Sequence, residues 1–144
     1  MKLIFILIAT CIILPFNTNA KNKSFGDVEV IKVTSIYDGD SFRADLKGLP
    51  AIVGEHMAIR INGIDMPELR GKCDKEKQLA RAAKQFTVER SRATKIIVLK
   101  NIKRGKYFRL IADVYIDGVS LGDLLIQNHH AIKYVGKAKP DWCT

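Results

Sequence analysis

The stretch that decides the fold lies at residues 57–68 and reads MAIRINGIDMPE. Every second residue from Met57 to Ile61 is a large apolar one, which is the period of a strand with one buried face. Gly63 and Pro67 then end the regular pattern, because both residues favour turns and irregular backbone. We therefore predict a strand that runs directly into a polar break.

Two more strands are predicted upstream of this stretch. Val28–Ile36 is rich in β-branched residues, and Phe42–Leu46 alternates apolar with polar side chains. Asp38 and Gly39 between them are a hairpin turn signal. Residues 47–55 contain two glycines and a proline, which predicts a loop before the next strand.

A long helix is predicted downstream, from Lys75 to about Ala93. Leu79, Ala83 and Phe86 fall on one face of it, while Lys and Arg side chains crowd the other. Asp74 is the predicted N-cap, since its side chain can accept from the first free backbone amides.

Two further strands and a short helix complete the predicted order. The strands are 95–100 and 107–116, separated by a basic loop at 101–106. Asp117-Gly118 is a second turn signal, and residues 120–123 match a capping box that starts a helix ending near 128. This order of elements, with three strands, a helix, two strands and a helix, is that of a five-stranded OB-fold barrel. An α+β sandwich could have the same order of elements.

The first twenty residues have the features of a secretory signal peptide. Lys2 precedes an apolar run from Leu3 to Leu14, and the small residue Ala20 ends the segment. We predict cleavage after Ala20, which leaves one domain at 21–144 that is secreted or periplasmic. An uncleaved anchor and lipidation of Cys11 are the alternatives.

The charge of the chain points to polyanionic partners. The formal net charge is +9, and the signal segment contributes only one lysine to it. A small basic domain attracts nucleic acid, anionic membrane or acidic polysaccharide. Cys73 and Cys143 remain after cleavage, and two cysteines in an exported chain suggest a disulfide, with two free thiols as the alternative.

Acidic and basic side chains occupy the ends of the predicted strands. Asp40, Asp65 and Glu68 lie in two breaks, and carboxylate oxygens are the ligands that hard cations such as Ca²⁺ prefer. Arg60 and Arg109 lie on strands, where a guanidinium is preorganised to hold phosphate oxygens. Together these residue types could carry out phosphodiester hydrolysis.

Several motifs resemble the staphylococcal nuclease-like (thermonuclease) family. Residues 36–42, IYDGDSF, are similar to its aspartate-glycine-aspartate-threonine turn. Residues 59–68 resemble its arginine-leucine-x-glycine-isoleucine-aspartate-x-proline-glutamate segment almost position for position, and 106–112 and 118–125 resemble its later strand and helix. The resemblance covers about 28–134 and implies an OB barrel with flanking helices that cleaves DNA and RNA with Ca²⁺.

The resemblance also implies a role for each matching residue. Asp40 and Asp65 would supply the calcium carboxylates, and the backbone carbonyl of Met66 would be a third protein ligand. Met66 stands where threonine is usual in the family, which a carbonyl ligand tolerates. Because the tail that ends at Thr144 is short, we expect the chain to lack a third helix that the family has.

The remaining matched residues would act on the substrate. Glu68 would position the attacking water or act as general base, and Arg60 and Arg109 would hold the phosphate. Lys106 and Tyr107 match positions near the nucleotide. The residue after Tyr107 is a phenylalanine where the family has glycine, so the local backbone is expected to differ.

Three classes of function compete at this stage. The first is a secreted Ca²⁺-dependent nuclease, monomeric and free of the membrane once its signal is cleaved, with DNA and/or RNA as substrate. The second is a non-catalytic OB module that binds nucleic acid through charge and aromatic stacking. The third is a structural or adhesion domain, which has no need for arginines on two strands.

Overall fold

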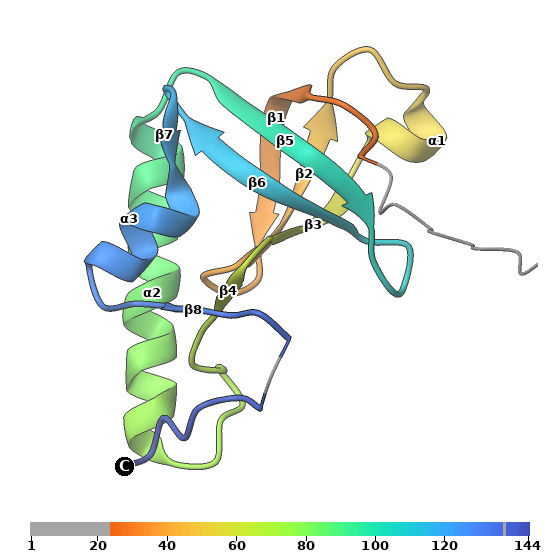
Figure 1. The fold of residues 1–144 in the computed structure, drawn as a ribbon. Helices are drawn as coiled ribbons and strands as arrows, with labels where there is room; N and C mark the ends of the chain where they lie inside the picture. The colour runs from red at the N-terminus through yellow and green to blue at the C-terminus, as the bar shows by residue number, and fades with distance from the viewer. Residues whose placement is uncertain (1–23, 137) are drawn as a thin grey trace, which may run out of the picture.

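A closed barrel forms the centre of the molecule in the computed structural model, which describes residues 24–136 and 138–144 (Figure 1). The predicted signal segment lies outside the described residues. The barrel strands are β1 (Val28–Ile36), β2 (Ser41–Leu46), β3 (Met57–Ile61), β5 (Ile97–Arg104) and β6 (Leu110–Ile116).

The strand order confirms the predicted OB-fold. The strands follow one another as β3-β2-β1-β5-β6 with antiparallel pairing, and β3 then pairs with β6 in parallel to close the barrel. The long strand β1 joins the two hairpins of the barrel, since it pairs with β2 along most of its length and with β5 through its first residues. The fold is thus α+β and mainly β, as predicted.

Helices and short strands surround the barrel. The helices are α1 (Ala51–Gly54), α2 (Asp74–Ala93) and α3 (Leu121–Gln127). The short strands are β4 (Ile64–Asp65), β7 (Val119–Ser120) and β8 (Ile132–Lys133). Figure 1 shows α2 running down one side of the barrel, with α3 and β8 crossing in front of it.

The alternation of each strand fills the barrel interior. β6 alternates between fully and partly buried residues along its whole length, and Ile59, Ile61 and Leu99 are almost completely buried. Leu121 and Leu125 of α3 join the same core. Figure 1 and the pairing of β4 with β8 place the segment after β3 at one end of this core, where irregular backbone can carry polar side chains.

Two local predictions around the helices were wrong. The loop predicted at 47–55 contains the short helix α1, which follows Pro50 and is closed by the hydrogen bond from Gly54 N to Pro50 O at 2.8 Å. The N-cap of α2 is Cys73, not Asp74, and its sulfur accepts from Glu76 N. Asp74 is instead the first helical residue, where its negative charge interacts favourably with the positive end of the helix dipole.

The boundary between β5 and β6 also differs from the prediction. β5 continues through the predicted basic loop to Arg104, because a bulge at Asn101, with φ +52°, absorbs a register shift against β6. β6 begins only at Leu110, because Tyr107 and Phe108 have φ values of +56° and +55° and cannot extend a strand.

The turn between β1 and β2 forms as predicted, but Gly39 serves a different purpose there. Neither Asp38 nor Gly39 has the positive φ of a type I′ hairpin. Instead, a Cβ at Gly39 would lie 2.3 Å from the Met66 side chain and 3.2 Å from Ala83 on α2. Thr87 of α2 donates a buried hydrogen bond of 2.7 Å to the Gly39 carbonyl, so the helix fixes this turn.

The predicted disulfide is present. Cys73 and Cys143 are bonded, with their Cα atoms 6.0 Å apart, across a separation of 70 residues. The bond ties the C-terminal tail to the start of α2 (Figure 1). Within the described ranges, no helix is long and apolar enough to cross a membrane.

Candidate active site

A cavity of about 710 Å³ opens at the end of the barrel beside the β1–β2 turn. Six of the residues predicted from the sequence line it: Asp40, Arg60, Asp65, Met66, Glu68 and Arg109. Asp38 and Lys139 line it as well. The cavity therefore gathers side chains from β2, β3, the segment around β4, the β5–β6 hairpin and the tail.

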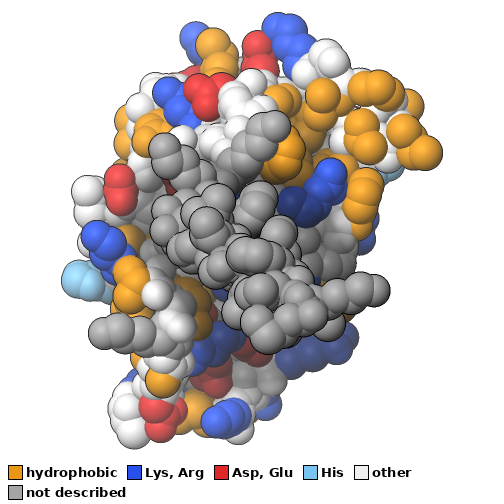
Figure 2. Space-filling model, turned by 45° about the vertical axis from the view of Figure 1, so that its right-hand side comes forward, with side chains coloured by type: hydrophobic (Ala, Val, Ile, Leu, Met, Phe, Trp, Pro, Cys, Tyr) orange, Lys and Arg blue, Asp and Glu red, His pale blue; other side chains and the backbone are white. Residues whose placement is uncertain are grey.

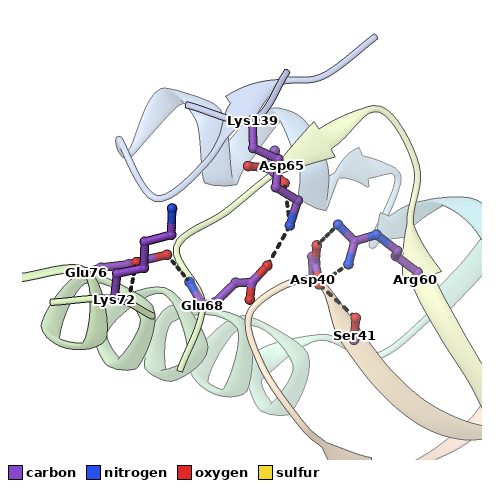
Figure 3. A network of polar contacts seen from close by, with 8 residues as sticks. All are labelled: Asp40, Ser41, Arg60, Asp65, Glu68, Lys72, Glu76 and Lys139. Atoms are coloured by element: carbon purple, nitrogen blue, oxygen red, sulfur yellow. Dashed lines mark hydrogen bonds and ion pairs between the residues drawn. The ribbon is translucent and has the colours of Figure 1, made fainter. Parts of the chain in front are cut away.

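Asp40 and Arg60 are brought together by the pairing of β2 with β3. Ser41 is opposite Arg60 in the ladder, and Ile61 N donates to Asp40 O at 2.8 Å. The Arg60 guanidinium then holds both carboxylate oxygens of Asp40, at 2.7 and 3.2 Å (Figure 3). Burial nevertheless raises the pKa of Asp40 to about 6, because desolvation outweighs the attraction of Arg60 and Asp38 adds repulsion.

Asp65 is the most deeply buried acid of the cavity, only 1% exposed. It is the last residue of β4, and Ile132 of β8 pairs with it. Its Oδ2 is buried without a hydrogen-bond partner, and its Oδ1 lies 3.7 Å from the ammonium of Lys139. The adjacent Met66 packs its side chain into the core and also lines the cavity.

Glu68 is exposed, but a buried glutamate fixes its backbone. Glu76 on α2 accepts from Glu68 N at 3.2 Å and from Lys72 N at 2.8 Å (Figure 3). Gly71 leaves the room for this arrangement, since a Cβ there would lie 2.3 Å from the Glu76 carboxyl carbon. Glu76 is a positioning residue that the sequence analysis missed, because the predicted N-cap was Asp74 and nothing in the sequence marked Glu76 as buried.

Lys139 pairs with Glu68 more closely than with any other described residue, at 2.5 Å from Oε1. This hydrogen bond lowers the pKa of Glu68 below its ordinary value and raises that of Lys139. Lys139 was not predicted as a site residue. Nothing in its local sequence indicates that the tail returns to this cavity.

Arg109 reaches the cavity from the turn between β5 and β6. Gly105 N donates to Arg109 O at 2.7 Å and closes that hairpin. The next residue, Leu110, is opposite Ile59 in the parallel ladder, which brings Arg109 to the same barrel end as Arg60. The Nε of Arg109 is buried without a partner among the described residues, so this guanidinium has capacity for an anion.

Lys106 and Tyr107 do not line the cavity. Both lie at the exposed tip of the same hairpin, and Tyr107 is 92% exposed. Phe108 beside them is exposed too, with the Arg104 guanidinium 4.6 Å from its ring centroid. The tip thus presents two aromatic rings and basic groups outside the cavity, a combination that suits stacking against bases.

The acids of the cavity have the chemistry of a hard-cation site. Asp40 and Asp65 are buried, Asp65 Oδ2 and Asp38 Oδ1 lack hydrogen-bond partners, and the pKa of Asp40 is raised by burial. A divalent cation would satisfy these oxygens. A second group, Cys73, Glu76 and Cys143, also lies close together, but its two sulfurs are bonded to each other and are not thiolate ligands.

Comparison with known proteins agrees with the geometry. A family model described as staphylococcal nuclease homologue matches residues 58–141, which is more than half of the chain. The chain belongs to this family. The match includes Arg60, Asp65, Glu68 and Arg109, whereas Asp40 precedes it. No curated protein matches the chain. Membership indicates a nuclease or nucleic-acid-binding function.

Proposed function

We propose that this protein is a Ca²⁺-dependent nuclease that hydrolyses phosphodiester bonds in DNA and/or RNA. The observation that carries the proposal is a single cavity holding the buried acids Asp40 and Asp65 together with Glu68 and two arginines. A module that only binds nucleic acid gains nothing from burying two carboxylates against a polyanion, because like charges repel.

The predicted site residues of the cavity have separate tasks in this reaction. Asp40, Asp65 and the Met66 carbonyl would hold Ca²⁺, which supplies positive charge beside the phosphate. Arg109, whose buried Nε lacks a partner within the described structure, would bind a non-bridging phosphate oxygen. Arg60 exchanges part of its contact with Asp40 for a second oxygen. Both guanidinium groups then face charge that grows as the phosphorus gains a fifth oxygen.

Glu68 is suited to handle the water. Its side chain is exposed at the cavity while Glu76 fixes its backbone, so it can orient a water molecule and accept its proton. The water oxygen bonds to phosphorus, the bond to the leaving oxygen breaks, and that oxygen takes a proton from solvent.

The surface outside the cavity suits a polyanionic substrate. Figure 2 shows many Lys and Arg side chains on the drawn face, with acidic side chains fewer and scattered. Together with the net charge of +9, these groups attract the phosphate backbone without reading its sequence. Tyr107 and Phe108 at the hairpin tip would stack on bases next to the cleaved bond.

Cleavage of a labelled single-stranded DNA and an RNA oligonucleotide tests the function. We expect the purified protein to cut at least one of them with Ca²⁺ and to stop when the ion is chelated. Glu68→Gln should slow single-turnover cleavage by about 10²-fold or more while it still binds the oligonucleotide, because the water loses its base. Binding without cleavage by the parent protein, with Ca²⁺ present, would favour the non-catalytic module instead.

We also propose that the protein is exported, from the apolar segment that follows Lys2 and ends at Ala20. The Cys73–Cys143 bond supports this proposal, because disulfides persist in oxidising compartments. N-terminal sequencing of the protein released by expressing cells should find Lys21 as the first residue. A chain that stays with the cells and begins at Met1 would contradict export.

A further inference from the structure

The tail of the protein places a cation inside the site. Figure 3 shows Lys139 reaching down between Asp65 and Glu68, with its ammonium directed at both carboxylates. The distances are 3.7 Å to Asp65 Oδ1 and 2.5 Å to Glu68 Oε1. The Lys139 side chain is half exposed, whereas the Asp65 side chain is almost completely buried.

The fold holds this lysine in place through several contacts. The disulfide anchors Cys143 at the start of α2, close after Lys139 in the chain. The other end of the tail is fixed at Tyr134, whose N donates to Gly63 O at 2.8 Å. With both ends fixed, the tail confines the ammonium near the carboxylates at a high effective concentration.

Internal cations therefore pair with three of the acids in the cavity. Arg60 holds Asp40, and Lys139 holds Asp65 and Glu68. Among the described residues, Lys139 is the only cation within ion-pair distance of Asp65. A buried carboxylate without a counter-charge is strongly destabilising, so the pair stabilises the protein when no metal is bound.

We propose that Lys139 is an internal counter-cation for Asp65 and Glu68, and that a divalent cation displaces it on binding. The inference rests on the proposed function, because it takes Asp65 as a metal ligand. A metal at Asp65 repels the ammonium and replaces its charge. Release of Lys139 also frees Glu68 for the water. The tail thus lowers the affinity for the metal and couples metal binding to the release of Glu68 from its ion pair with Lys139.

Calcium titration calorimetry on the purified protein without substrate tests this proposal. We expect Lys139→Ala to bind Ca²⁺ about three- to tenfold more tightly than the parent, because the ion no longer competes with an ion pair. Lys95→Ala is the matched control, since it removes the same charge from an exposed residue just beyond the C-terminal end of α2 that does not line the cavity. Its affinity should change by less than about twofold, because salt screens exposed charges at that distance. Lys139→Arg should remain close to the parent.

Removal of the anchor gives a second, independent measurement. The Cys73→Ala/Cys143→Ala variant should show part of the Lys139→Ala increase in calcium affinity, because the ammonium is less confined. In a protein that already carries Lys139→Ala, the same cysteine changes should leave the affinity nearly unchanged. This non-additivity separates a tethered cation from a general loosening of the fold.

The outcomes distinguish this inference from the proposed function. If the parent binds Ca²⁺ and Lys139→Ala behaves like Lys95→Ala, or binds more weakly, displacement is refuted while the nuclease proposal stands. If neither the parent nor any variant binds Ca²⁺, the metal assignment itself fails and the inference fails with it.

Discussion

Arg109→Ala is expected to slow single-turnover cleavage about 10²–10³-fold at saturating Ca²⁺, the loss seen when one preorganised donor to a developing charge is removed. The buried Nε of Arg109 has no partner in the described part of the chain, so no ion pair must break before it binds phosphate. The calcium affinity should stay within about threefold of the parent, because Arg109 contacts none of the proposed ligands. Rapid-quench cleavage with a calcium titration measures both quantities.

Two variants control for charge and for geometry in this experiment. Arg92→Ala removes the same charge from the last turn of α2, away from the cavity, and should cut at nearly the parent rate. Arg109→Lys keeps the charge but loses the planar fork, so it should recover little of the activity. A parent-like rate for Arg109→Ala would mean that the phosphate lies elsewhere, even if Ca²⁺ still binds.

The barrel could be predicted from the sequence because each strand has its own alternating pattern of apolar and polar residues. Alternation around Ile59 and Ile61, and again along β6, marks the buried face of each strand, and the turn residues mark the ends. The parts that were wrong depend on contacts between strands. The bulge at Asn101 is set by the pairing of β5 with β6, and the left-handed residues before Arg109 lie in the tight turn between the paired residues Arg104 and Leu110; no short window of sequence contains this pairing.

The same distinction applies to the candidate site. Asp40 and Arg60 could be predicted to act together only through the family resemblance, since the ladder between β2 and β3 joins residues far apart in sequence. Glu76 has the sequence context of an ordinary exposed helix residue, yet it is buried beneath the segment that carries Glu68. Lys139 lies in a tail with little regular structure. The disulfide ties this tail to the start of α2, and the two cysteines were the only indication of that in the sequence.

The role of the disulfide leads to the second large effect that we expect. Reduction of Cys73–Cys143 should lower the free energy of unfolding by about 4 kcal/mol or somewhat less, because the bond closes a loop of 70 residues and removes conformational entropy from the unfolded chain. The bond joins the tail to the first turn of α2, so it restrains the two segments that carry Lys139 and Glu76. Urea unfolding followed by circular dichroism, with and without reductant, measures the difference.

The Cys73→Ala/Cys143→Ala variant makes this measurement specific. It should unfold at about the urea concentration of the reduced parent, and reductant should not change that value. A small part of its loss comes from Cys73 itself, whose sulfur accepts from Glu76 N as the cap of α2. If the oxidised and reduced parent proteins unfold at the same urea concentration, the disulfide contributes nothing to global stability, and the entropic argument for its effect is refuted.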